Sequence, residues 1–152
     1  MIGLQIVLDS LEVGSRTPLA PSGRVWLELD GKNFPDYGWV DLPLSVVGSM
    51  KTAIESIRSG EEGDFYFFEG PYFVKLLPAK VESGAAGARV VCLCDRASLP
   101  GEDGGGVVEG EALVPLADVE EVYRRAVRDL LGWATRNDEA EAVSVLSQMS
   151  LP

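Results

Sequence analysis

The stretch NFPDYGWVDLPLSVV, residues 33–47, determines where this chain changes from strand to helix. It follows residues 24–30, RVWLELD, where Val25, Leu27 and Leu29 alternate with other side chains as in a strand that buries one face. It leads into a segment with the apolar spacing of a helix. Two prolines, three aromatic residues and two carboxylates are crowded into this connection. The stretch therefore predicts either a structural lock between two elements or a binding site.

The lock hypothesis assigns a structural role to the main residues of this stretch. Pro35 restricts Phe34 to extended geometry, and Phe34 and Trp39 are predicted to anchor the connection in the core. Asp41 stands where a helix could begin, so its side chain could accept from free backbone amides, with Pro43 tolerated in the first turn. An asparagine would cap nearly as well, so Asp41→Asn is predicted to keep most of the stability.

Strand patterns recur on both sides of this stretch. Short apolar runs bounded by Gly, Pro, Asp and Ser predict about six strands, mostly in hairpin order, which favours antiparallel pairing. These runs are residues 2–8, 24–30, the two halves of 64–78 about a turn at 69–71, 88–95 and 107–116. A long turn is expected at residues 14–23 and a hairpin loop at the glycine-rich residues 101–106.

Three segments have helical spacing. Residues 45–60 carry one apolar stripe of Val47, Met50, Ile54 and Ile57, and Gly60 is placed to end the helix. Residues 116–134 are the clearest helix, with Asp118 near its start. Its apolar face consists of Val119, Val122, Tyr123, Ala126, Val127, Leu130 and Leu131. A short helix in residues 138–149 is predicted to be capped by Asp138 and to bury Ala142, Val143, Leu146 and Met149.

These patterns predict one α+β domain spanning residues 1–152. We expect an antiparallel sheet of about six strands with helices packed on one face and a long C-terminal helix. A chain of 152 residues can bury roughly 70% of the surface that its unfolded form exposes, so it needs no metal or disulfide to fold. The N-terminal MIGLQIVLDS lacks the features of a signal peptide, and no run crosses a membrane, so a cytoplasmic location is expected.

Composition excludes several classes of function. The chain has no histidine, which excludes catalytic triads and zinc sites that use histidine. Its 13 basic and 24 acidic residues give a net charge of −11, which disfavours nucleic acid and favours a basic protein partner, although such acidity is also a common solubility device. The carboxylates of Asp36, Asp41 and Glu69 match no metal-binding loop, and no cofactor or metal is predicted. Cys92 and Cys94 are predicted to be reduced, mostly buried thiols.

The order of motifs resembles small bacterial immunity proteins of polymorphic toxin systems, which bind toxins encoded beside them. The likeness spans residues 24–135 and runs from a Phe-Pro pair and Trp-x-Asp through a Gly-Pro-Tyr hairpin to a long C-terminal helix. The matching residues are Phe34, Pro35, Trp39, Asp41, Gly70, Pro71 and Tyr72. One departure is the first helix, where the resemblance leads us to expect a tryptophan and this chain has Met50, Ile54 and Ile57.

Three functions remain open from the sequence. The first is an interaction protein whose acidic surface inhibits a basic toxin, with Asp36 and Tyr37 pointing outward. The predicted contact residues are Asp36, Tyr37, Glu61, Glu62, Asp64, Glu69 and Tyr72. The second is an enzyme or small-molecule binder with a pocket lined by Trp39, Asp41 and Tyr72. The third is a subunit of a homo-oligomer, to which Trp26 and Trp133 could contribute exposed aromatic surface.

Overall fold

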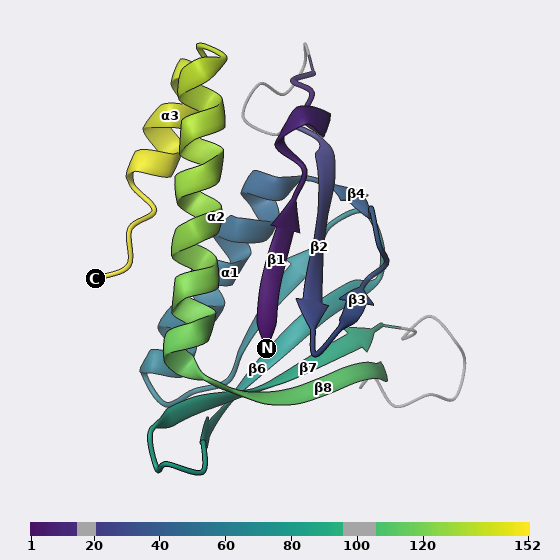
Figure 1. Cartoon of the computed structure of the whole chain (residues 1–152), viewed down its shortest axis with the longest axis vertical. Coiled ribbons are helices and arrows are strands. Elements are labelled where there is room, and N and C mark those ends of the chain that lie inside the picture. The colour runs from purple at the N-terminus through teal and green to yellow at the C-terminus, as the bar shows by residue number, and fades with distance from the viewer. Residues whose placement is uncertain (15–20, 96–105) are drawn as a thin grey trace.

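The computed structural model describes residues 1–14, 21–95 and 106–152. Strands come first and helices last, with one helix between the two groups of strands (Figure 1). The elements are β1 (Ile2–Ile6), the 3₁₀ turn η1 (Leu8–Ser10), β2 (Gly23–Leu29), β3 (Lys32–Phe34), β4 (Val40–Asp41), α1 (Pro43–Arg58), β5 (Gly63–Phe67), β6 (Tyr72–Lys80), β7 (Ala86–Cys94), β8 (Val107–Pro115), α2 (Leu116–Arg136) and α3 (Ala140–Ser147). Residues 101–105 of the predicted loop and residues 15–20 of the predicted turn lie outside the described residues.

The strands form two antiparallel sheets, so the prediction of one sheet with about six strands is wrong. In the first sheet β2 pairs with β1 on one edge and with β3 and β4 on the other. The second sheet has the order β5-β6-β7-β8. The two extra strands are only three and two residues long and lie in or beside the stretch that the sequence presents as a connection. They complete the first sheet before α1 carries the chain to the second, which explains the division.

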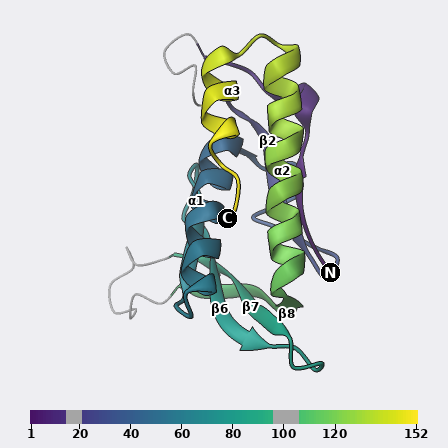
Figure 2. The same ribbon diagram turned by 90° about the vertical axis from the view of Figure 1, so that its left-hand side faces the viewer.

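Helices α1 and α2 lie side by side against the second sheet and also contact the first sheet (Figure 2). Helix α1 packs on β5 and β6, while α2 packs on β1, β7 and β8. The apolar stripe predicted for α1 is buried, and Gly60 follows the helix with a φ of 82°, as the sequence predicts. The α+β class and the long C-terminal helix are therefore confirmed.

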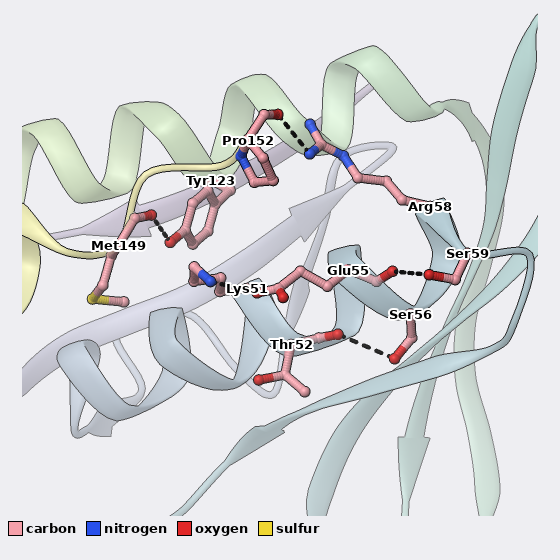
Figure 3. A network of polar contacts seen from close by, with 9 residues as sticks. All are labelled: Lys51, Thr52, Glu55, Ser56, Arg58, Ser59, Tyr123, Met149 and Pro152. Carbon is pink, nitrogen blue, oxygen red and sulfur yellow. Dashed lines mark hydrogen bonds and ion pairs between the residues drawn. The ribbon is translucent and has the colours of Figure 1, made fainter.

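The C-terminal segment is fixed against α1 and α2 by polar contacts to its backbone (Figure 3). The buried Tyr123 hydroxyl of α2 donates to the carbonyl oxygen of Met149. Arg58 of α1 donates to the carbonyl oxygen of Pro152 at 2.9 Å and forms an ion pair with Glu120. Apolar side chains of α3 pack into the same core, as predicted. The helices thus hold the chain after α3 in place through main-chain acceptors.

The position of Asp138 and the exposure of two tryptophans differ from the sequence prediction. Asp138 does not cap α3, because the cap position is Glu139 and no side chain bonds there; Asp138 instead has a positive φ of 56° in the turn. Trp26 and Trp133 are only 6% and 7% exposed. The Trp26 indole donates to Asn33 Oδ1 at 3.1 Å and packs against Tyr37. These tryptophans therefore offer no exposed aromatic surface to a second copy.

Both cysteines are free and buried, as predicted. Burial raises the pKa of Cys92 to about 12; the charge of Glu109 acts in the same direction and that of Lys32 opposes it. Burial, assisted by Glu55, also raises the pKa of Tyr123 to about 12. In both cases the folded state keeps a proton that the unfolded chain releases at lower pH.

We expect the free energy of unfolding to fall between about pH 9 and pH 12. Over that range the unfolded chain loses protons from Cys92 and Tyr123 while the folded protein retains them, so unfolding becomes more favourable. Urea unfolding at pH 8, 10 and 11 measures this. Cys92→Val should reduce the decline by up to about 1.4 kcal/mol per pH unit, and an identical decline in the variant would contradict the assignment.

None of the helices within the described ranges is long and apolar enough to span a membrane.

Candidate functional site

The Asp41 carboxylate lies at the centre of the junction between the two sheets. Its side chain is fully buried. Oδ1 accepts from the backbone amides of Leu42 at 2.7 Å and Phe68 at 3.0 Å, and Oδ2 accepts from the Trp39 indole at 2.8 Å and the Glu69 amide at 3.1 Å. Four donors thus converge on one carboxylate, two of them from the turn between β5 and β6.

The prediction that Asp41 caps α1 is wrong. The helix begins at Pro43 with Leu42 at the cap position, and no side-chain hydrogen bond caps it. Asp41 belongs to β4 and joins this short strand to a turn 27 and 28 residues later in the chain. The residue is still a structural lock, but it acts between sheets.

An aromatic cluster surrounds this lock. The Tyr72 ring meets those of Trp39 and Phe34 edge to face, with centroids 5.3 and 5.6 Å apart, and Phe34 also packs on Phe67. Phe34 is buried, and Trp39 packs on the core while partly exposed. Both anchor the connection, as predicted.

Asp41 is not available to line a pocket with Trp39 and Tyr72. Asp41 is enclosed, and its two oxygens already accept four hydrogen bonds, so no lone pair is directed at open space. A hollow beside Tyr72 has a volume of about 290 Å³. Its lining is Tyr66, Phe67, Phe68, Gly70, Pro71, Tyr72, Phe73 and Asp95.

The structure divides the predicted contact residues into separate groups. Asp36 and Tyr37 are exposed in the loop between β3 and β4, where Asp36 Oδ1 accepts from the Tyr37 amide at 2.9 Å. Glu69 is exposed in the β5–β6 turn, and Tyr72 is half-buried in the aromatic cluster. The remaining residues, Glu61, Glu62 and Asp64, lie at the opposite end of β5.

The outer face of the β5–β8 sheet joins two of these groups. In β5 the side chains of Asp64 and Tyr66 alternate with the buried Phe65 and Phe67, while Glu62 precedes the strand and Phe68 follows it. Residues two apart on a strand share a face. The acidic end of β5 and its aromatic end therefore belong to one continuous surface.

An apolar row crosses this outer face at one register. Tyr66 is paired with Phe73, Phe73 with Leu93, and Leu93 with Val108. Tyr66 and Val108 are 45% and 55% exposed, while Leu93 is covered by its neighbours. Phe68, 49% exposed, extends the row beyond β5, and its ring lies 6.3 Å from that of Tyr66. We call Tyr66, Phe68, Phe73 and Val108 the open-face row.

A charged row lies next to the open-face row. Lys75 Nζ is 3.1 Å from Asp64 Oδ1 and 3.5 Å from Glu62 Oε1. Burial lowers the pKa of Lys75, but these carboxylates outweigh that effect and hold the pKa above its ordinary value. Arg89 pairs with Glu111 at 2.7 Å in the same sheet. Most basic charge on this face is therefore already neutralised by acidic neighbours.

The aromatic members of the open-face row were not among the contact residues predicted from the sequence. In DFYFF every position from 65 to 68 is aromatic, so the pattern does not distinguish the face toward the core from the one toward solvent. The alternation of Glu62 and Asp64 with Gly63 and Phe65 was the available signal, since it places Tyr66 and Phe68 on the polar face.

Comparison with known protein families, with curated proteins and with solved structures finds no match to this chain.

Proposed function

We propose that this chain is an interaction protein that binds and inhibits a basic protein, a cognate toxin, through the outer face of the β5–β8 sheet. The observation that carries the proposal is the open-face row, in which exposed aromatic rings lie beside carboxylates. Aromatic residues in such positions provide most of the affinity at protein interfaces, while surrounding charges steer the approach.

The apolar part of this surface suits a protein partner. Tyr66 and Phe68 each leave about half of their side chain uncovered, and they border a shallow hollow instead of a deep cleft. Large aromatic side chains gain most when a partner removes the remaining water from them. A partner that inserts an apolar side chain beside Phe68 would complete their burial.

The charge of this surface suits a basic partner. Glu62, Asp64 and Glu69 flank the aromatic rings, and Lys75 is held between two of these carboxylates. The whole chain carries a net charge of −11, which attracts a cationic protein over a distance set by the ionic strength. Association should therefore be fast at low salt and slower at high salt.

Calorimetric titration with a basic protein encoded next to this chain tests the proposal. We expect Phe68→Ala to weaken binding by about 2 kcal/mol, as for a residue that carries much of the interface energy, with little change in melting temperature because Phe68 lies outside the core. Val145→Ala is the matched control, because Val145 is also an exposed apolar residue, 40% exposed on α3.

A salt series completes this experiment. Raising the salt concentration should slow association while the effect of Phe68→Ala persists, because the aromatic contact does not depend on charge. Affinity for the neighbouring protein no greater than for an arbitrary basic protein such as cytochrome c would refute the proposal. Equal losses in Phe68→Ala and Val145→Ala would place the contact elsewhere.

A further inference from the structure

The geometry points to a second docking site, independent of the open-face row: an extended basic segment of a partner protein pairs with the free edge of β1, in the groove between β1 and α2. Strand β1 is an edge of the first sheet, and α2 runs beside it on the side opposite β2 (Figure 1). All five residues of β1 line this groove, whose volume is about 370 Å³.

The hydrogen-bond pattern shows which backbone groups of β1 face the groove. The Asp30 amide donates to the Met1 carbonyl oxygen, and the Val7 amide donates to the Arg24 carbonyl oxygen. Because bonding alternates along an antiparallel strand, Gly3 and Gln5 also bond to β2. The amides and carbonyls of Ile2, Leu4 and Ile6 therefore point away from β2, and no strand in the described part of the chain pairs with them.

The side chains of β1 leave room for another backbone. Leu4 and Ile6 pack on the core, and Gln5 donates to Glu28 on β2 at 3.2 Å. Gly3 lies in the strand interior, where glycine is common when another backbone approaches closely. A Cβ at Gly3 would meet only the side-chain Nε2 atom of Gln5, at 3.4 Å. Packing within the chain therefore does not require glycine at this position.

The opposite wall of the groove is acidic. One face of α2 contributes Asp118, Glu121 and Asp129, with Arg125 as the single cation among them. All four side chains are exposed. At one end of the groove the Met1 ammonium is already paired with Asp30 at 2.6 Å. With three carboxylates and one guanidinium the helix wall has a net charge of −2, which suits Lys or Arg at every second position of an added strand.

This charge argues against a second copy of the chain as the occupant. Pairing two β1 edges would bring two acidic helix walls together in molecules that each carry a charge of −11. Addition of an extended segment to an exposed sheet edge is instead a recurrent mode of peptide recognition. Main-chain hydrogen bonds provide affinity and alternate side chains provide specificity.

Hydrogen exchange and NMR titration of the full-length ¹⁵N-labelled chain test the site, with the peptide acetyl-Lys-Val-Lys-Val-Lys-Val-amide as the probe. In the free protein we expect the Leu4 and Ile6 amides to exchange faster than those of Gly3 and Gln5. Saturating peptide should slow exchange at Leu4 and Ile6 by more than tenfold. Unchanged exchange at these two amides would overturn the proposal.

Peptide variants separate strand pairing from simple charge attraction. Residues that bond to one edge of a strand also share a face, so methylation of either the three lysine or the three valine amides should abolish binding while methylation of the other set is tolerated. A peptide with Glu in place of Lys should bind more than tenfold more weakly. Equal binding of both methylated peptides would show that backbone pairing is not involved.

Protein variants locate the site. Leu4→Pro removes an amide that does not bond to β2, and Leu4→Ala is its matched control because it loses a similar side chain but keeps the amide. We expect at least tenfold weaker binding for Leu4→Pro than for Leu4→Ala. If Leu4→Pro does not fold, the exposed double variant Glu121→Lys/Asp129→Lys should show the same loss.

Two outcomes assign the edge differently and overturn the proposal. Concentration-dependent protection of Leu4 and Ile6 without peptide, together with a dimer in sedimentation, would identify a second copy as the occupant. Peptide affinity lost in Phe68→Ala but kept in Leu4→Pro would place the peptide on the open-face row. The site at β1 requires that peptide affinity is lost in Leu4→Pro and kept in Phe68→Ala. This expectation holds whether or not the open-face row binds a toxin.

Discussion

Replacing Asp41 with alanine is expected to lower the free energy of unfolding by about 3 kcal/mol or more, because hydrogen bonds to a buried charged group are lost and their donors remain buried. The Trp39 indole and the amides of Leu42, Phe68 and Glu69 all lose their acceptor. Two of these amides belong to the β5–β6 turn, so the contact between the two sheets should loosen. Urea unfolding measures the loss.

The Asp41→Asn substitution should also be damaging. Each carboxylate oxygen accepts from two donors, so the side-chain NH₂ group of the variant would turn its own donors toward two N–H groups. We expect a loss of about 2 kcal/mol, in contrast to the near-neutral effect predicted for a helix cap. Asp36→Asn is the matched control, because that exposed carboxylate accepts only the amide of Tyr37. Similar stability of both asparagine variants would contradict the lock.

Gly63→Ala is expected to lower the free energy of unfolding by about 2 to 3 kcal/mol through overpacking between β5 and α1. A Cβ at position 63 would lie 2.6 Å from the carbonyl oxygen and 2.8 Å from the Cα of Ala53. Both are backbone atoms of a buried helix, so the clash is relieved only if α1 moves away from the sheet. Urea unfolding again gives the magnitude.

Gly48→Ala, within α1 itself, is the control for this clash. A Cβ there would touch only the end of the Met149 side chain at 3.9 Å, and alanine favours the helix, so we expect a gain of about 0.5 to 1 kcal/mol. A loss in Gly63→Ala and a gain in Gly48→Ala would show that the close approach of α1 to β5, which Gly48 does not share, causes the loss. A Gly63→Ala protein as stable as wild type would rule out that approach.

The periodic parts of the fold could be predicted from the sequence because burial imposes their patterns. The α1 stripe of Met50, Ile54 and Ile57 and the alternation around Leu27 indicate helix and strand locally. Strands β3 and β4 could not be recognised in this way, since two or three residues carry no period. Their assignment depends on pairing with β2, which is a tertiary contact.

The candidate site was harder to predict for the same reason. Asp41 lies two residues before a proline in the sequence, and a cap was the nearest local explanation. Its true partners, Phe68 and Glu69, are brought to it only by the folding of the second sheet. Likewise, Tyr66 and Phe68 are aromatic like their buried neighbours Phe65 and Phe67. The sequence alone therefore does not show which of the four side chains face solvent.

The buried carboxylate of Asp41 has a structural role, and the open-face row has the proposed role of binding the partner. These roles are separated by measuring two quantities in the Asp41→Asn and Phe68→Ala variants, under conditions where both variants remain folded. The quantities are the melting temperature and the affinity for the basic protein encoded next to this chain. We predict that Asp41→Asn lowers the melting temperature and keeps most of the affinity, and that Phe68→Ala keeps the melting temperature and loses affinity. An Asp41→Asn variant with unchanged melting temperature and lost affinity would contradict the structural role of Asp41, because the carboxylate would then belong to the binding site.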